Sequence, residues 1–124
     1  MDEPTTHTGP LRAYADAGYV PLCRDLADVR TNIDRLDERI VALIAERAMY
    51  VKDAARFKRD AFQVSAPARQ EDVFRKVRLL AQRYDRGFEH LDEVVDAAYR
   101  AMVAAFIANE QRYFQAMVPT GEDA

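Results

Sequence analysis

The chain has 124 residues, 49% of them hydrophobic and 31% charged, which is the balance of a single globular domain. A net charge of −3 argues against a nucleic-acid partner, and no apolar run approaches the roughly 18 residues of a membrane span. A single cysteine excludes an internal disulfide, and the first twenty residues have no apolar signal core. We therefore expect a cytoplasmic protein in a reducing compartment.

Helical signals follow one another along the chain, and no strand signal interrupts them. We interpret residues 1–24 as a flexible N-terminal arm, 25–117 as one helical domain and 118–124 as a tail. Within the domain, apolar periodicity predicts three helices, at about 25–59, 67–85 and 89–117, with a loop at 60–66. The fold class expected from this pattern is all-α, with a long first helix in a three-helix protomer.

Residues suited to helix ends mark these boundaries. Asp25 is a candidate N-cap of the first helix. Ser65, with Pro67 two residues later, indicates the start of the second helix, because proline is tolerated in a first turn. Gly87 is a good C-terminal stop for that helix.

A heptad seam runs along the first helix. Its members share spacings of three and four residues, with one gap of seven: Leu26, Val29, Ile33, Leu36, Ile40, Leu43, Tyr50, Ala54 and Phe57. Such a seam is typical of a long helix packed lengthwise on other helices. A chain this short has too little thickness to cover the seam by itself, so we expect an oligomer.

Arg47 occupies the seam position that the gap leaves out. Burying an unpaired charge costs several kcal/mol, so the pattern predicts an anionic partner for this guanidinium. One interpretation is an internal carboxylate that sets the helix register, for which Glu110 is a candidate. The other is a bound anion.

Two further cations share the first helix with Arg47. Lys58 follows eleven residues later, three full turns along a continuous helix, so it is predicted on nearly the same face. Arg30 precedes Arg47 by seventeen residues, about 25 Å along the axis, so one small ligand cannot touch both. If two copies pair antiparallel, Arg30 of one chain reaches the Arg47 site of the other.

Other chemistry is scarce in the sequence. His7 and His90 do not have the spacing of metal ligands, so no metal site is predicted. Cys23 has no visible activating partner. A glycine-rich phosphate loop and a nucleophile elbow are both absent from the sequence.

The pattern of the first helix resembles that of the all-helical chorismate mutases, over about residues 25–115. The residues that carry this resemblance run from Leu26-Ala-Asp-Val-Arg30 through Ile33-Asp34, Asp37, Ile40-Val41, Leu43, Arg47, Val51 and Ala54 to Lys58. Pro67-Ala-Arg69, followed by Val73, resembles the family's Pro-x-Arg-Glu signature. The stretch 50–58 is similar to the isochorismate-pyruvate lyase branch of that family.

The resemblance implies an intertwined homodimer with two active sites and no cofactor. Arg47 and Lys58 would then hold the carboxylates and ether oxygen of a dicarboxylate substrate, and Arg30 would arrive from the other protomer. It also places three further residues among the expected substrate contacts: Arg69, Gln70 and Glu110. Lys58, Glu110 and Arg47 are the expected catalytic residues.

Two positions depart from the commonest mutase pattern. Gln70 stands where a glutamate is expected, and it accepts a substrate hydroxyl only as a neutral group. Glu110 stands where a glutamine is expected, so it must be protonated to donate to the ether oxygen. Gln111 is the neighbouring alternative, since only helical register aligns this region.

The expected function is therefore chorismate mutase, which rearranges chorismate to prephenate for aromatic amino acid biosynthesis. The alternative is an isochorismate-pyruvate lyase, which gives salicylate and pyruvate in a siderophore pathway. Elimination needs almost the same pocket as rearrangement, so the sequence separates the two poorly. A non-enzymatic helical dimer, such as an adaptor or ligand sensor, is a minor alternative that does not need these three cations in one register.

Overall fold

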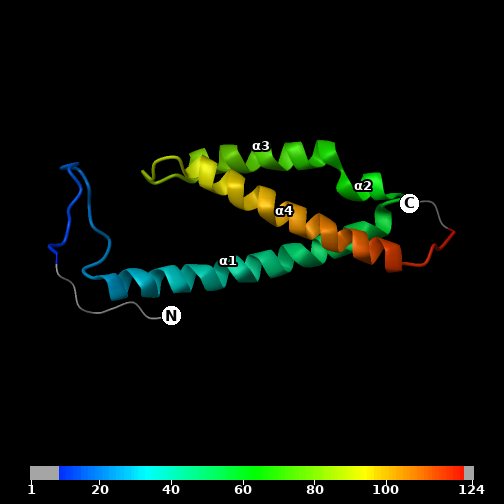
Figure 1. The fold of residues 1–124 in the computed structure, drawn as a ribbon, viewed down its shortest axis with the longest axis horizontal. Helices are drawn as coiled ribbons and strands as arrows, with labels where there is room; N and C mark the ends of the chain where they lie inside the picture. Colours follow the sequence, from blue (N-terminus) through cyan, green and yellow to red (C-terminus); the bar gives the residue numbers. More distant parts are fainter. Residues whose placement is uncertain (1–8, 122–124) are drawn as a thin grey trace. The chain divides into compact units, whose positions relative to one another are not determined.

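A computed structural model describes residues 9–121, and every regular element in this range is helical (Figure 1). The long helices are α1 (Leu26–Ala54), α3 (Pro67–Tyr84) and α4 (Leu91–Ala116). Between α1 and α3 lie a 3-10 turn, η1 (Ala55–Phe57), and a short helix, α2 (Ala61–Ser65). The predicted all-α class with three long helices is confirmed. Residues 1–8 of the predicted arm and 122–124 of the predicted tail lie outside the described residues.

Contacts divide the chain into two compact units, with the boundary after Arg39 inside α1. In the first unit, the carboxylate of Asp16 accepts a hydrogen bond from the backbone N–H of Gly18 (2.9 Å), and the rings of Tyr14 and Tyr19 pack with centroids 4.6 Å apart. The start of α1 is capped as predicted, because Asp25 Oδ1 accepts from the backbone N–H of Asp28 (2.8 Å).

The second unit holds the core. Phe74, Val77 and Ala81 form the buried stripe of α3, which packs against α4. Val103 is the buried apolar residue of α4. The guanidinium of Arg100 lies over the ring of Phe74, 4.4 Å from its centroid, and closes one side of this contact.

Two predictions about the segment between α1 and α3 were wrong. The first helix ends at Ala54 and tightens into η1, so it does not continue to residue 59. Residues 61–65 form α2, where a loop was expected. Asp60 caps this helix by accepting from the backbone N–H of Gln63 (2.8 Å).

The helix start predicted from Ser65 and Pro67 is confirmed, because α3 begins at Pro67 with proline in its first turn. Ser65 itself is the last residue of α2. The N-cap of α3 is Ala66, whose φ of 44° is in the left-handed region and turns the chain between the two helices. Gly87, the predicted C-terminal stop, follows the last residue of α3, Tyr84, by three positions and has a φ of 103°.

No residue of α1 is buried within the single chain. The predicted seam stays open, with Ile40 52% and Leu43 63% exposed. None of the helices in the described range is long and apolar enough to cross a membrane.

Candidate active site

A cavity of about 430 Å³ lies within the second unit. Its walls come from the C-terminal half of α1, from Lys58 after η1, and from α2, α3 and α4. Five of the six site residues expected from the sequence line this cavity: Arg47, Lys58, Arg69, Gln70 and Glu110. Three of the five are cations, so the cavity offers several donors to an anionic ligand.

Arg47 is half-buried and faces two aromatic rings of α4. Its guanidinium carbon is 5.2 Å from the centroid of the Phe106 ring and 6.0 Å from that of Tyr99. Within residues 9–121, no carboxylate lies at ion-pair distance from Arg47. The internal carboxylate that the seam pattern allowed is therefore not supplied by the described part of this chain.

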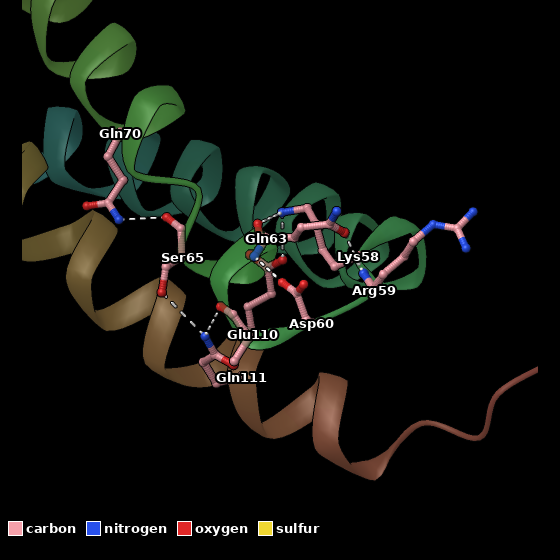
Figure 2. A network of polar contacts seen from close by, with 9 residues as sticks. Lys58, Arg59, Asp60, Gln63, Ser65, Gln70, Glu110 and Gln111 are labelled. Carbon is pink, nitrogen blue, oxygen red and sulfur yellow. Dashed lines mark hydrogen bonds and ion pairs between the residues drawn. The ribbon is translucent and has the colours of Figure 1, made fainter.

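Lys58 and Glu110 form an ion pair at the cavity wall, with Nζ 3.2 Å from Oε2 (Figure 2). Glu110 is buried, with 5% of its surface exposed. Glu110, the candidate internal partner of Arg47, thus pairs with Lys58 instead. A buried carboxylate with a cation partner is the arrangement that avoids a large desolvation penalty.

The prediction that Lys58 belongs to a continuous first helix was wrong. Its backbone is extended, with φ −92° and ψ 145°, because the helix has already ended. The side chain arrives at the cavity from this extended segment, and its Nζ also donates to the backbone carbonyl of Gln63 (3.1 Å).

Of the two neighbouring α4 residues, Glu110 lines the cavity and Gln111 does not. Successive residues of a helix point about 100° apart, and Gln111 is turned toward α2. Its Nε2 donates to the carbonyl of Ala61 (2.8 Å) and lies 3.5 Å from Ser65 Oγ. Of the two alternatives that the sequence left open, the carboxylate of Glu110 is therefore the one at the cavity.

The first turn of α3 contributes Arg69 and Gln70. The guanidinium of Arg69 pairs with Asp72 at 3.1 Å on an exposed edge of the cavity. A hydrogen bond from Lys76, with the charges of Lys76 and Arg75, holds the pKa of Asp72 below its usual range. Gln70 Nε2 donates to the carbonyl of Ser65 (2.6 Å), an orientation that leaves Oε1 as an acceptor.

Arg30 is the predicted site residue that the cavity does not include. It belongs to α1 and lies in the first unit, which ends at Arg39. In the described range, no group of three histidine, cysteine, aspartate or glutamate side chains gathers as a possible metal site.

Sequence reasoning missed the role of α2 in this site. The signal was present as Asp60 followed three residues later by Gln63, a spacing found at helix starts. Gln63 makes two hydrogen bonds at this helix start. Its backbone N–H donates to Asp60, and its Oε1 accepts from the backbone N–H of Arg59 (2.6 Å). A helix of five residues is too short to show the apolar period by which the longer helices were found.

The described part of the chain thus combines an all-helical fold with a cavity whose lining includes three cationic side chains. Comparison with protein families then shows which family the chain belongs to. The model of the family described as chorismate mutase type II matches residues 29–111, about two thirds of the chain. The chain belongs to this family.

Three curated relatives have known names. The isochorismate pyruvate lyase of Pseudomonas aeruginosa is 47% identical over 47 residues, which cover 38% of this chain and 46% of the relative. The chorismate mutase of Methanocaldococcus jannaschii is 33% identical over 61 residues, 48% of this chain and 62% of the relative. The bifunctional chorismate mutase/prephenate dehydratase of Aquifex aeolicus is 31% identical over 90 residues, 71% of this chain and 24% of the relative. The chain thus spans less than two thirds of the length of each.

Proposed function

We propose that this protein is a chorismate mutase, an isomerase that converts chorismate to prephenate for aromatic amino acid biosynthesis. The observation that carries the proposal is Arg47, a half-buried cation at a cavity wall without a carboxylate partner in the described chain. A ligand carboxylate provides the charge-assisted partner that this guanidinium otherwise lacks. Family membership and two relatives named as chorismate mutases support the choice of substrate.

The reaction is a unimolecular pericyclic rearrangement, which needs neither a nucleophile nor a metal. The site has to hold a diaxial conformer that is scarce in water and to stabilise negative charge on the breaking ether oxygen. In this proposal Arg47 fixes a substrate carboxylate. Lys58 and Glu110, which already meet at the cavity wall, flank the ether oxygen. No cofactor takes part.

Arg69 and Gln70 complete the proposed substrate contacts from α3. Gln70 Oε1 remains an acceptor for a substrate hydroxyl, while the exposed Arg69 supplies charge near the entrance. Exchange of the ion pair between Arg69 and Asp72 for a contact with substrate is inexpensive, since surface pairs are worth about 0–1 kcal/mol.

The proposed assembly is an intertwined homodimer whose helical domain covers residues 25–117. Two copies of α1, packed antiparallel along their seams, cover apolar side chains that the single chain leaves exposed. This arrangement brings Arg30 of one protomer to the Arg47 site of the other and gives two equivalent sites. We place the dimer in the cytoplasm, without nucleic-acid or membrane partners.

Isochorismate-pyruvate lyase activity is the second candidate. The relative with that name shares 47% identity over its matched stretch, although this stretch covers 38% of the present chain. Purified protein assayed separately with chorismate and isochorismate distinguishes the two. Faster formation of prephenate supports the mutase, whereas pyruvate and salicylate from isochorismate alone would replace it with the lyase.

A mixing experiment tests the shared site. Arg30→Ala and Arg47→Ala are each expected to be inactive, and subunit exchange between them gives heterodimers with one doubly substituted site and one intact site. Activity per heterodimer should return towards half of the wild-type value. Absence of recovery, with exchange proven by native mass spectrometry, would contradict a site built from both chains.

A further inference from the structure

The ammonium group of Lys58 is fixed by two acceptors from different elements. Glu110 Oε2 comes from α4 at 3.2 Å, and the backbone carbonyl of Gln63 comes from α2 at 3.1 Å (Figure 2). Because the second acceptor is a main-chain group, its place depends on where α2 itself lies. Any residue that holds α2 therefore also controls the position of Nζ.

An isolated helix of five residues has no stability of its own in water. The cap from Asp60 and the burial of Val64, which is 1% exposed, help to hold α2 in place. From α4, the amide of Gln111 (labelled in Figure 2) donates to the carbonyl of Ala61 in α2 at 2.8 Å. Gln111 directly follows Glu110, so adjacent residues of α4 hold Lys58 and α2.

The orientation of the Gln111 amide is set by this bond. Its Oε1 is buried without a hydrogen-bond partner among the described residues. Leaving a buried carbonyl unsatisfied is unfavourable, but a flipped amide would place Oε1 against the Ala61 carbonyl and lose the donor altogether. The side chain thus keeps its hydrogen bond to α2, and its Oε1 stays without a partner among the described residues.

We infer that Gln111 is a positioning residue, which holds α2 against α4 so that the Gln63 carbonyl and Glu110 together fix the ammonium group of Lys58. Its action passes through the backbone of α2, and Gln111 itself is not among the residues that line the cavity. This geometry is independent of which reaction the site performs. Only the kinetic test below rests on the proposed function.

The structural test is Gln111→Met, which keeps the length of the side chain and removes the donor. The chain has three lysines, so a ¹⁵N spectrum of the lysine ammonium groups contains few signals, and Lys58→Met assigns the relevant one. We expect the Lys58 signal to shift or broaden in Gln111→Met as its hydrogen bonds loosen. The signals of Lys52, over the Tyr113 ring, and Lys76, paired with Asp72, should stay in place.

Gln115→Met is the matched control, because Gln115 is an exposed glutamine one turn further along the same helix. It should leave the Lys58 signal unchanged. Gln111→Glu, measured at neutral pH, removes the donor in a second way and should reproduce the change. An unaltered Lys58 signal in folded Gln111→Met, or the same change in Gln115→Met, would overturn the inference.

The kinetic test separates positioning from general stability. Gln111→Met should lower kcat by roughly ten- to a hundredfold, because Lys58 is displaced from the reacting atoms, with KM changed less than about threefold. In a Lys58→Met background the same substitution should lower kcat by less than about twofold. Equal losses in both backgrounds would show that Gln111 acts elsewhere. If neither substrate reacts, the proposed function fails while the ammonium spectrum still decides this inference.

Discussion

The helices α1 and α3 carry similar apolar stripes but bury them very differently. Phe74, Val77 and Ala81 of α3 are at most 8% exposed, because α4 covers them. In α1, which is longer, Leu36 is 43% exposed and Leu43 is 63% exposed. The same periodicity thus marks an internal core in one helix and an uncovered face in the other, so periodicity by itself does not say which chain covers a stripe.

The two helices also differ in whether an arginine of each has a carboxylate partner within the described chain. On α3, Arg78 pairs with carboxylates of α4, with its Nη1 3.5 Å from Asp96 Oδ2 and its Nη2 3.6 Å from Asp92 Oδ2. On α1, Arg47 faces aromatic rings of α4 and finds no carboxylate within the described chain. A satisfied cation contributes to folding, whereas an unsatisfied one at a cavity wall is suited to a ligand.

The largest effect is expected for Arg47→Ala. Activity should fall by roughly a thousandfold or more, because a donor to the substrate is removed from a partly desolvated site. Stability should change little or even rise, since no internal ion pair is broken. Thermal melts by circular dichroism alongside the chorismate assay measure both quantities.

Arg35→Ala is the control for Arg47→Ala, because Arg35 is an exposed arginine on the same helix. It should keep both activity and stability. Should Arg47→Ala unfold under conditions in which wild type stays folded, Arg47 would be a structural residue like Arg78, and the contrast between the helices would disappear.

The second prediction concerns the stripes themselves. Phe74→Ala should destabilise the fold by about 3–5 kcal/mol through cavity formation, in addition to its lost contact with Arg100. Leu43→Ala should instead weaken association and make the melting temperature depend on protein concentration. Sedimentation equilibrium combined with melts at several concentrations separates the two behaviours.

Leu79 of α3 is the reference for Leu43, because it is exposed to a similar extent, 58%. Leu79→Ala should stay within about 0.5 kcal/mol of wild type at every concentration. A wild-type protein that sediments as a stable folded monomer at micromolar concentration would show that the seam of α1 is simply solvated.

The sequence was sufficient to predict the helices whose apolar periodicity extends over several turns. The bounds of α3 and α4 were predicted to within two residues, since periodicity and end residues act together over several turns. Arg47 and Lys58, which both line the cavity, were candidates from the sequence, the former as a break in an otherwise regular seam. Periodicity measures which side of a helix is apolar, and it carries this information only while the helix continues.

The region after Ala54 shows where this information ends. Residues 55–66 change conformation every few residues, from η1 through an extended segment to α2 and the left-handed Ala66. Asp60 and Gln63 give a local signal for α2. The bond from Gln111 to the Ala61 carbonyl joins residues fifty positions apart, so no local pattern predicts it. Lys58 lines the cavity, although the helical backbone predicted for it was wrong.

A third prediction compares two carboxylates of α4, starting with Glu110. A carboxylate beside the ether oxygen would repel the developing charge, whereas a neutral amide at the same place donates a hydrogen bond to it. Glu110→Gln should therefore keep or raise kcat with chorismate, and Glu110→Leu, which has no donor, should lower it. An equal loss of kcat in both variants would remove Glu110 from this role.

The smallest effect is expected at Asp96, the carboxylate that belongs to the α3–α4 contact. Its Oδ2 accepts from Arg100 Nε at 2.8 Å and lies 3.5 Å from a nitrogen of Arg78. The hydrogen bond from Arg100, with the charges of Arg100 and Arg78, holds the pKa of Asp96 below its usual range. The same bond raises the pKa of Arg100.

Because the pKa of Asp96 in the folded state lies below its unfolded value of about 3.9, this group stabilises the fold fully above about pH 5. The contribution is lost as pH falls through the folded pKa. Asp96→Asn should therefore lower the melting temperature slightly near neutrality, and its curve should converge with that of wild type at about pH 3 or below. Asp37→Asn, at an exposed position of α1, should follow wild type throughout. An offset for Asp96→Asn that is equally large at acid and neutral pH would mean that Asp96 stabilises the contact by shape alone, without using its charge.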